Sequence, residues 1–331
     1  MSEPIVAVAG VSKRFVQPLD LAARAANLLG AGLRERTIQA LDSIDLTVRD
    51  GEVVGLVGES GCGKTTLGRI VAGILAPSQG EVRFRGRPVA KLDGVADRDL
   101  ARKIQMIFQD PMASLNPRMR VGDIIGEAPV VHGLIAKAER ADYVAGMLAR
   151  VGLDPAYGGR YPHQFSGGQR ARIGIARALA VRPEFLVCDE SVAALDVSIQ
   201  AQVLNLFMQL RADLGLTYLF ISHNLGVVEH LSDRVVILYL GRVVEIAPTE
   251  QLFRAPNHPY TQALLANVPR LEARKRRFAP IAGEIPSSLA PPSGCHFHPR
   301  CPFAMARCRS ERPPLIEIAP GRMSACHLNT K

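Results

Sequence analysis

Aromatic side chains are scarce in this chain of 331 residues, which has no tryptophan and only 5% Phe, Trp and Tyr together. Single-stranded nucleic acids are usually held by stacking their bases on aromatic rings, so this scarcity argues against such recognition. Long apolar runs are also missing, since none approaches the roughly 18 residues of a membrane span. The N-terminus lacks a basic segment followed by an apolar stretch, the pattern of a secretory signal. We therefore expect the chain to remain in the cytoplasm.

Acidic residues are outnumbered, because 40 Lys and Arg stand against 31 Asp and Glu, for a net charge of +9. This excess is compatible with a nucleic acid or an anionic membrane face as a neighbour. Much of it lies in one basic run at residues 274–277, which is equally typical of a solvated linker. The length of the chain predicts about two domains with a well-buried core.

The segment G-E-S-G-C-G-K-T fits the pattern G-x-x-x-x-G-K-S/T of a phosphate-binding loop. It follows an apolar run at 53–57 and precedes a predicted helix that begins at Lys64, as such a loop requires. Its glycines turn backbone N–H groups toward a polyphosphate, and the helix presents its positive N-terminal end to the same anion. The pattern therefore predicts binding of a nucleoside triphosphate. The predicted binding residues are Gly58, Ser60, Gly61, Cys62, Gly63, Lys64, Thr65 and Thr66.

Two further apolar strands are predicted to end in polar residues. Residues 185–188 lead into Asp189 and Glu190, and residues 218–221 lead towards His223. Adjacent carboxylates at the end of a buried strand are costly unless a cation or water partners them. Ligands of open α/β sheets bind beyond the carboxyl ends of the strands, so we expect these groups to meet the phosphate loop there.

The rest of the pattern predicts an α/β fold with three parts. Alternation of apolar and polar residues at 44–48 and 82–84 predicts an antiparallel β layer beside the phosphate-loop strand. A helical insert is expected at about 114–180, where helical periodicity replaces alternation. Past residue 255 prolines crowd in and four of the six cysteines appear. We therefore predict a first domain at 1–255 and a small, loop-rich domain at 256–331.

The order of these motifs resembles that of the nucleotide-binding subunit of an ABC transporter. The stretch Phe165-Ser166-Gly167-Gly168-Gln169 is similar to the L-S-G-G-Q signature of that family. The resemblance covers residues 1 to about 250 and implies a P-loop ATPase that hydrolyses ATP with Mg²⁺. One signature and one phosphate loop per chain imply a two-fold dimer with composite sites. In the family, Ser166, Gly167, Gly168 and Gln169 contact the nucleotide bound to the opposite subunit.

The resemblance also implies roles for single residues. Lys64 neutralises phosphate charge, Thr65 and Gln109 ligate Mg²⁺, and Asp189 supports its water shell. Glu190 polarises the attacking water, and His223 contacts the γ-phosphate. The implied catalytic residues are Lys64, Gln109, Glu190, Asp196 and His223. Phe15 has two open interpretations, stacking on adenine or packing in the core.

Two departures from the family pattern follow the catalytic carboxylate and the histidine. Residues 191–193 read S-V-A where the family usually has P-T-S, and Asn224 replaces an Asp. Glu190 and Asp196 are retained, so we expect an active site.

Segments H-P-Y-T-Q at 258–262 and C-H-F-H-P-R-C-P at 295–302 resemble the C-terminal extension of oligopeptide and dipeptide importers. The resemblance implies a peripheral subunit at the cytoplasmic face of the inner membrane that powers peptide import. Its implied partners are two transmembrane permease subunits, a second and paralogous ATPase subunit, and indirectly an extracytoplasmic solute-binding protein. Nickel and glutathione are alternative solutes. A soluble ABC ATPase acting on nucleic acid is a rival, but such proteins carry two cassettes or a long coiled coil, so no nucleic acid partner is expected.

Four cysteines in the last part of the chain match the number of thiolates that a four-iron four-sulfur (4Fe-4S) cluster needs. Similar extensions in the importer family bind such a cluster, which the resemblance therefore implies here. Zinc is the alternative, with a histidine in place of one thiolate. Four buried free thiols are the structural alternative. The candidate ligands are Cys295, Cys301, Cys308 and Cys326, and the candidate histidines are His296, His298 and His327.

Overall fold

The computed structural model describes residues 3–19, 35–89, 98–267 and 283–330, together with residues 27, 30 and 32. The basic run at 274–277 lies outside them. The strands are β1 (Val6–Gln17), β2 (Arg36–Val48), β3 (Val53–Val57), β4 (Gln79–Phe84), β5 (Arg87–Pro88), β6 (Ile104–Ile107), β7 (Phe185–Asp189), β8 (Thr217–Ile221), β9 (Arg234–Tyr239), β10 (Arg242–Pro248), β11 (Ile316–Ala319) and β12 (Arg322–Ser324). The helices are α2 (Lys64–Val71), α3 (Arg98–Lys103), α4 (Pro111–Ser114), α5 (Val121–Val131), α6 (Arg140–Arg150), α7 (Gly167–Leu179), α8 (Val197–Leu214), α9 (Leu225–Leu231), α10 (Thr249–Arg254), α11 (Pro259–Ala266) and α12 (Ala306–Ser310).

The main sheet has eight strands in the order β11-β12-β10-β9-β3-β8-β7-β6. Strands β9, β3, β8, β7 and β6 run parallel, and every residue of β3, β7 and β8 is buried. Continuous apolar runs suit such strands because both faces of the sheet are covered. In β7, Phe185 and Val187 pack into one hydrophobic core while Leu186 and Cys188 pack into another. The α/β prediction is confirmed.

A second sheet of four strands, in the order β2-β1-β4-β5, is antiparallel throughout. Helix α2 lies between this layer and the main sheet, since it contacts β1 and β2 on one side and β7 and β8 on the other. Its Leu67 and Ile70 share a core with Val6 and Val8 of β1. The predicted antiparallel layer therefore covers the helix that follows the phosphate loop.

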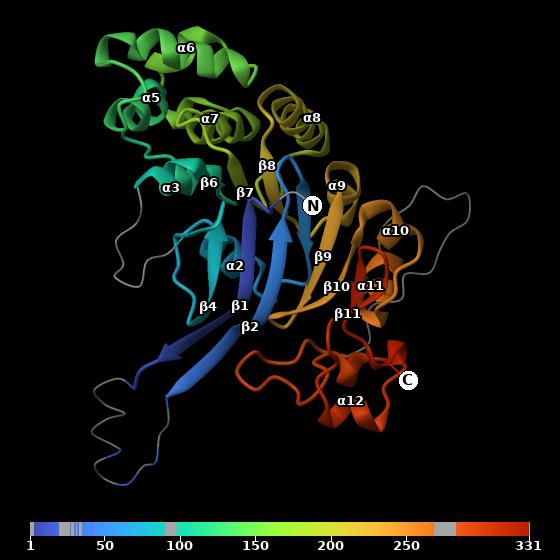
Figure 1. Cartoon of the computed structure of the whole chain (residues 1–331). Helices are drawn as coiled ribbons and strands as arrows, with labels where there is room; N and C mark the ends of the chain where they lie inside the picture. Colours follow the sequence, from blue (N-terminus) through green and yellow to red (C-terminus); the bar gives the residue numbers. More distant parts are fainter. Residues whose placement is uncertain are drawn as a thin grey trace.

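The predicted insert is helical, and α5, α6 and α7 pack together at the top of the molecule (Figure 1). Val144, Met147, Leu148 and Val151 share one hydrophobic cluster with Ile173. Helix α7 joins the insert to β7, so the insert is continuous with the main core. Nowhere in the described ranges is a helix both long enough and apolar enough to span a membrane.

The C-terminal segment continues the main sheet instead of forming a sheet of its own. Strand β12 pairs antiparallel with β10, placing Ser324 opposite Glu245, and β11 follows β12 as the edge strand. The Ala325 N–H donates to the Val244 carbonyl at 2.8 Å. The remainder is loop-rich, with the short helix α12 below α11 (Figure 1).

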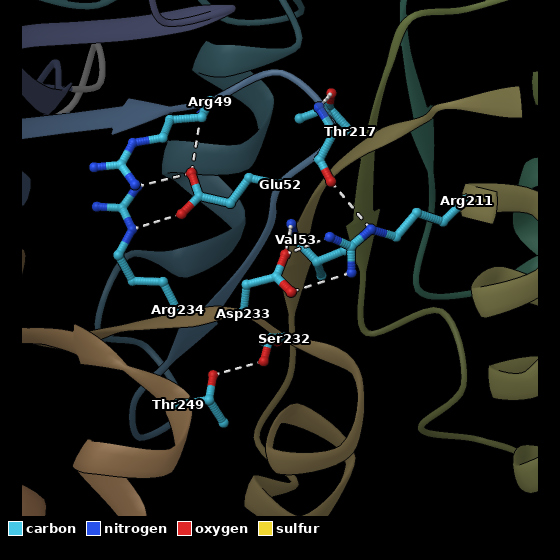
Figure 2. A network of polar contacts seen from close by, with 10 residues as sticks. Arg49, Glu52, Val53, Arg211, Thr217, Ser232, Asp233, Arg234 and Thr249 are labelled. Carbon is cyan, nitrogen blue, oxygen red and sulfur yellow. Dashed lines mark hydrogen bonds and ion pairs between the residues drawn. The ribbon is translucent and has the colours of Figure 1, made fainter. Parts of the chain in front are cut away.

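A polar network closes the amino ends of the central strands (Figure 2). Glu52, which precedes β3, accepts hydrogen bonds from the Arg234 guanidinium at 2.8 and 3.0 Å and from the Arg49 N–H at 2.9 Å. Asp233 accepts from the Val53 N–H at 2.8 Å and pairs with Arg211 at 2.6 Å. Burial would raise the pKa of Glu52, but the hydrogen bonds from Arg234 and Arg49 hold that pKa below its ordinary value. The network fixes β3 relative to β9 at the end opposite the site.

Candidate functional site

The phosphate loop runs from the end of β3 to the start of α2, as the sequence predicts. The Lys64 side chain is buried, and its ammonium donates to the Gly58 carbonyl at 2.7 Å and to the Glu59 carbonyl at 3.1 Å. The loop therefore wraps around a positive charge at a helix N-terminus. Ser60 and Gly61 are exposed at its tip, whereas Cys62 is buried beneath it. Thr65 and Thr66, both half-buried, form the first turn of α2.

Two glycines of the loop tolerate no side chain. A Cβ atom on Gly58 would lie 2.2 Å from the Leu238 carbonyl oxygen, and one on Gly63 would lie 2.5 Å from the Ala40 carbonyl oxygen. Gly63 also has φ of 107°, which L side chains rarely adopt. These glycines therefore let the loop backbone pack directly against the Leu238 and Ala40 carbonyl groups. The packing fixes the loop at the N-terminus of α2, where backbone N–H groups and the Lys64 ammonium fit a polyphosphate.

Thr65 and Asp189 provide oxygen atoms beside this cradle. The Thr65 hydroxyl donates to Asp189 Oδ1 at 3.1 Å. Burial raises the pKa of Asp189, the hydrogen bond from Thr65 lowers it, and the neighbouring Glu190 charge raises it, with a net increase. A buried carboxylate next to a hydroxyl and a phosphate cradle suits Mg²⁺, which prefers hard oxygen ligands.

Glu190 lies at the carboxyl end of β7, between two polar side chains from other segments. Its carboxylate accepts a hydrogen bond from the Gln109 amide at 2.7 Å and lies 3.3 Å from His223 Nδ1. Its backbone has φ of 45°, and its N–H donates to the Ile221 carbonyl at 3.0 Å. The parallel pairing of β7 with both β6 and β8 thus brings Gln109, Glu190 and His223 together. The structure places Gln109 on Glu190, while its predicted role as an Mg²⁺ ligand remains a prediction.

The signature segment opens α7. Ser166 caps the helix by accepting from the Gln169 N–H at 3.3 Å, and Gln169 accepts from the Ser166 N–H at 3.0 Å. Gly167 is exposed, and Gly168 approaches Ile199 of α8, where a Cβ would lie 2.3 Å from Ile199 Cγ2. Within the described ranges no hydrogen bond or ion pair joins this segment to the phosphate loop. The capping box uses the N–H groups of Ser166 and Gln169, and between them the exposed Gly167 opens α7 towards a ligand outside the chain's own loop.

Asp196 and Phe15 lie at the margin of the site. Asp196 is the exposed N-cap residue of α8, and its side chain makes no capping hydrogen bond. Phe15 is 39% exposed, and the Lys13 ammonium lies 5.3 Å from its ring centroid. This exposure leaves the ring open for stacking and argues against core packing. In the altered stretch, the buried Ser191 hydroxyl has no hydrogen-bond partner among the described residues.

Two residues that contact the phosphate loop, Tyr260 and Arg300, were missed by sequence reasoning. Glu59 of the loop is paired with Arg300, and its backbone N–H donates to the Tyr260 hydroxyl at 2.9 Å. Tyr260 lies in the first C-terminal motif and Arg300 in the second, and both motifs are identifiable in the sequence. About 200 residues or more separate them from the loop, so local sequence patterns do not predict the contact.

The predicted 4Fe-4S cluster is wrong. The described residues hold no group of three or more His, Cys, Asp or Glu that could bind a metal ion. Burial raises the pKa of Cys295 to about 11, with smaller contributions from neighbouring thiols, and it also raises the pKa of Cys301 and Cys326. All six cysteines are free.

Nothing in the described residues supports the zinc alternative either. His296 Nδ1 lies 3.0 Å from the Leu240 carbonyl, His298 Nδ1 lies 2.9 Å from the Cys295 carbonyl, and His327 Nε2 lies 2.9 Å from the Glu311 carbonyl. The number of thiols and histidines in the sequence suits a metal site, but the described residues do not bring three of these groups together around one point.

Comparison with known proteins agrees with this geometry. The family model described as "ABC transporter" matches residues 41–193, which contain the phosphate loop, the signature and Glu190. The family model described as "Oligopeptide/dipeptide transporter, C-terminal region" matches residues 244–308, which contain Tyr260 and Arg300.

Relatives and solved structures match at greater length. The oligopeptide transport ATP-binding protein AppF of Bacillus subtilis is 49% identical over 305 residues, which cover 90% of this chain and 93% of the relative. The structure of cbiO1 from Clostridium perfringens, part of the ABC transporter complex cbiONQ, has a TM-score of 0.61 at 25% identity and covers 77% of this chain and 92% of its own. The dimeric post-hydrolysis structure of the ATP-binding cassette MJ0796, bound to ADP and Pi, has a TM-score of 0.61 at 26% identity and covers 74% of this chain and 98% of its own.

Proposed function

Because this chain belongs to the ATP-binding subunits of oligopeptide/dipeptide ABC transporters, it is an ATPase that powers a peptide importer, and we propose how its residues perform that work. Glu190 carries the proposal, because Gln109 and His223 hold its carboxylate beside the phosphate loop. Glu190 is the general base that activates water for attack on the γ-phosphate of ATP.

The other residues of the site bind and orient the triphosphate. The Lys64 ammonium and the loop N–H groups neutralise phosphate charge, and Phe15 stacks on the adenine ring. Thr65 and Asp189 would hold Mg²⁺, with Gln109 as a further ligand. When bound, this ion stabilises the charge that develops on the phosphate oxygens. His223 contacts the γ-phosphate and so links the carboxylate to the nucleotide.

The complete site needs a second ATPase subunit. The signature N-terminus of α7 is exposed, and among the described residues no hydrogen bond or ion pair joins it to the phosphate loop of its own chain. This supports a composite site in which Ser166 and Gly168 meet the partner's nucleotide. Asp196 lies on the same exposed side, at the start of α8. We propose a heterodimer with a paralogous ATPase subunit.

A groove between α5 and β6 suits the permease subunits. It has a volume of about 670 Å³, and at its rim Ile74 and Val131 are 54% and 76% exposed. Exposed apolar side chains at a groove are typical of a protein interface. We propose that a cytoplasmic helix of one of the two transmembrane permeases docks here and that the other permease docks on the paralogous ATPase subunit. This docking places the subunit peripherally at the cytoplasmic face of the inner membrane. The solute, a di- or oligopeptide, reaches the permeases through an extracytoplasmic binding protein.

The test is reconstitution of the copurified permeases and ATPase subunits in lipid vesicles, with peptide uptake and phosphate release measured together. Glu190→Gln keeps the shape of the side chain but removes its charge, so hydrolysis should fall by roughly 10²-fold while ATP binding persists. Lys64→Ala should instead weaken ATP binding itself.

Glu229→Gln is the matched control, because this glutamate is exposed on α9, away from the site. Wild-type turnover in Glu190→Gln would exclude Glu190 as the general base. Uptake of nickel or glutathione in place of peptides would change the proposed solute and leave the ATPase assignment intact.

A further inference from the structure

Glu59, the second residue of the phosphate loop, makes hydrogen bonds through its carboxylate, its backbone N–H and its backbone carbonyl. Its carboxylate accepts two hydrogen bonds from the Arg300 guanidinium, at 2.7 and 3.0 Å. Its backbone N–H donates to the Tyr260 hydroxyl at 2.9 Å, and its carbonyl accepts from the Lys64 ammonium at 3.1 Å. Tyr260 and Arg300 both follow β10 in the chain. The C-terminal part of the protein is therefore in direct contact with the loop that binds ATP.

The pair between Arg300 and Glu59 is well shielded from water. The Arg300 side chain is 4% exposed and that of Glu59 is 20% exposed. Hydrogen bonding to Glu59 raises the pKa of Arg300, so its charge is permanent. A bidentate pair of this kind fixes direction as well as distance. It therefore constrains how the first turn of the loop faces the phosphate site.

An aromatic cluster in turn fixes Arg300 and Tyr260. The Tyr239 and Tyr260 ring centroids are 4.6 Å apart, and the Phe297 ring packs at 5.3 Å from Tyr239 and 5.4 Å from Tyr260. Arg300 also lies over the Tyr239 ring, at 5.9 Å from its centroid. These rings are buried, so the two polar groups that reach the loop have little freedom to move.

We propose that Arg300 and Tyr260 are positioning residues for ATP binding, through which the C-terminal extension sets the affinity of the phosphate loop. Arg300 neutralises a carboxylate that would otherwise repel a polyphosphate at close range, and Tyr260 orients the loop backbone by accepting the Glu59 N–H. The proposal rests on ATP binding at the loop, as proposed above, and assigns to the extension a role in it.

The extension does not depend on Arg300 for its attachment. Strand β12 pairs with β10, and the Arg242 guanidinium donates to the Gly294 carbonyl at 2.8 Å. Substitution of Arg300 should therefore leave the extension docked, and a change in ATP affinity would report on the loop.

The test uses the full chain in its transporter complex and a fluorescent ATP analogue, with equilibrium Kd, KM and kcat measured beside the melting temperature. Arg300→Gln should raise the Kd and KM for ATP about tenfold, with a smaller change in kcat. Arg300→Lys should recover part of the affinity, since a lysine keeps the charge but not the bidentate geometry. Glu59→Gln/Arg300→Gln should recover most of it, because no unpaired carboxylate remains.

Two further variants separate positioning from general stability. Tyr260→Phe removes the acceptor of the Glu59 N–H and should raise the Kd about threefold. Arg307→Gln is the matched control, because Arg307 lies in the same extension but pairs with Glu311 at the surface, and its Kd should be unchanged. Wild-type Kd and KM in Arg300→Gln, an equal loss in Arg307→Gln, or a double variant as weak as Arg300→Gln would overturn the proposal. Failure of the unmodified complex to bind ATP would instead overturn the proposed function.

Discussion

Single residues of this protein carry their effect through the partners that the fold supplies. Glu190 is one of two adjacent carboxylates, yet only Glu190 lies between Gln109 and His223, while Asp189 faces the Thr65 hydroxyl. A shift of one position along the chain thus separates the carboxylate proposed to activate water from the one proposed to support a cation.

Glu52 gives a prediction on stability at this scale. Glu52→Gln leaves the Arg234 guanidinium without its anionic partner, so the free energy of unfolding should fall by about 3 kcal/mol, as for other nearly buried pairs. The depressed pKa adds stability that is present above the ordinary pKa and is lost as the pH falls through the folded-state pKa. The variant should lack this part of the acid dependence in urea titrations.

The control for this prediction is Glu81→Gln, which breaks the surface pair with Arg83. Both partners there are about half exposed and screened by water, so the loss of stability should be much smaller than in Glu52→Gln. If both substitutions lowered the free energy of unfolding equally, the network at the amino ends of the strands would contribute no more to stability than a surface ion pair.

At the scale of elements, α11 depends on a buried histidine. His258 is the N-cap residue of α11, and its Nδ1 accepts from the Tyr260 N–H at 3.1 Å. Protonation at Nδ1 would remove this acceptor. Burial lowers the pKa of His258 to about 4, against a weaker opposing effect of a hydrogen bond with the Ala325 backbone. Burial and the Arg242 charge lower the pKa of His296 to about 4 as well.

These two histidines predict a loss of stability in mild acid. Above pH 6.5 neither the folded nor the unfolded state is protonated there, and as the pH falls from 6.5 towards 4 the unfolded state takes up the proton first. His258 alone should therefore cost about 3 kcal/mol at pH 4. His258→Asn keeps a capping acceptor without titrating, so it should reduce the pH slope by about half.

The measurement is hydrogen exchange of α11 and of residues 283–330 between pH 7 and pH 5. His230→Asn serves as the control because His230 is exposed. A slope unchanged in His258→Asn would assign the acid sensitivity to other groups.

The whole molecule shows which predictions a sequence can support. The phosphate loop, β7 and β8 were predicted correctly because each is a short continuous segment whose apolar run ends at the polar group concerned. The contact between Glu59 and Arg300 spans 241 positions and follows from sheet order and the packing of the extension, which local patterns do not encode. The metal site failed for a related reason, since a count of thiols carries no geometry.

Coupling to the membrane is also a property of the whole assembly. Ile74→Glu or Val131→Glu places a charge at the rim of the groove, where the proposed permease interface would bury it. Peptide uptake should fall at least tenfold while ATP binding by the isolated subunit is unchanged. Met208→Glu is the control, because Met208 is exposed on α8 outside the groove. Normal uptake in both groove variants would place the docking surface elsewhere.

The pairing of β12 with β10 has a consequence for solubility. Strand β10 is almost fully buried, and without the last strands it would present a row of unpaired N–H and C=O groups to any other chain. The hairpin of β12 and β11 covers the edge of β10, and the sheet now ends in an edge strand of four residues, β11, which includes the exposed Glu317. The tail thereby shields the chain from edge-to-edge aggregation.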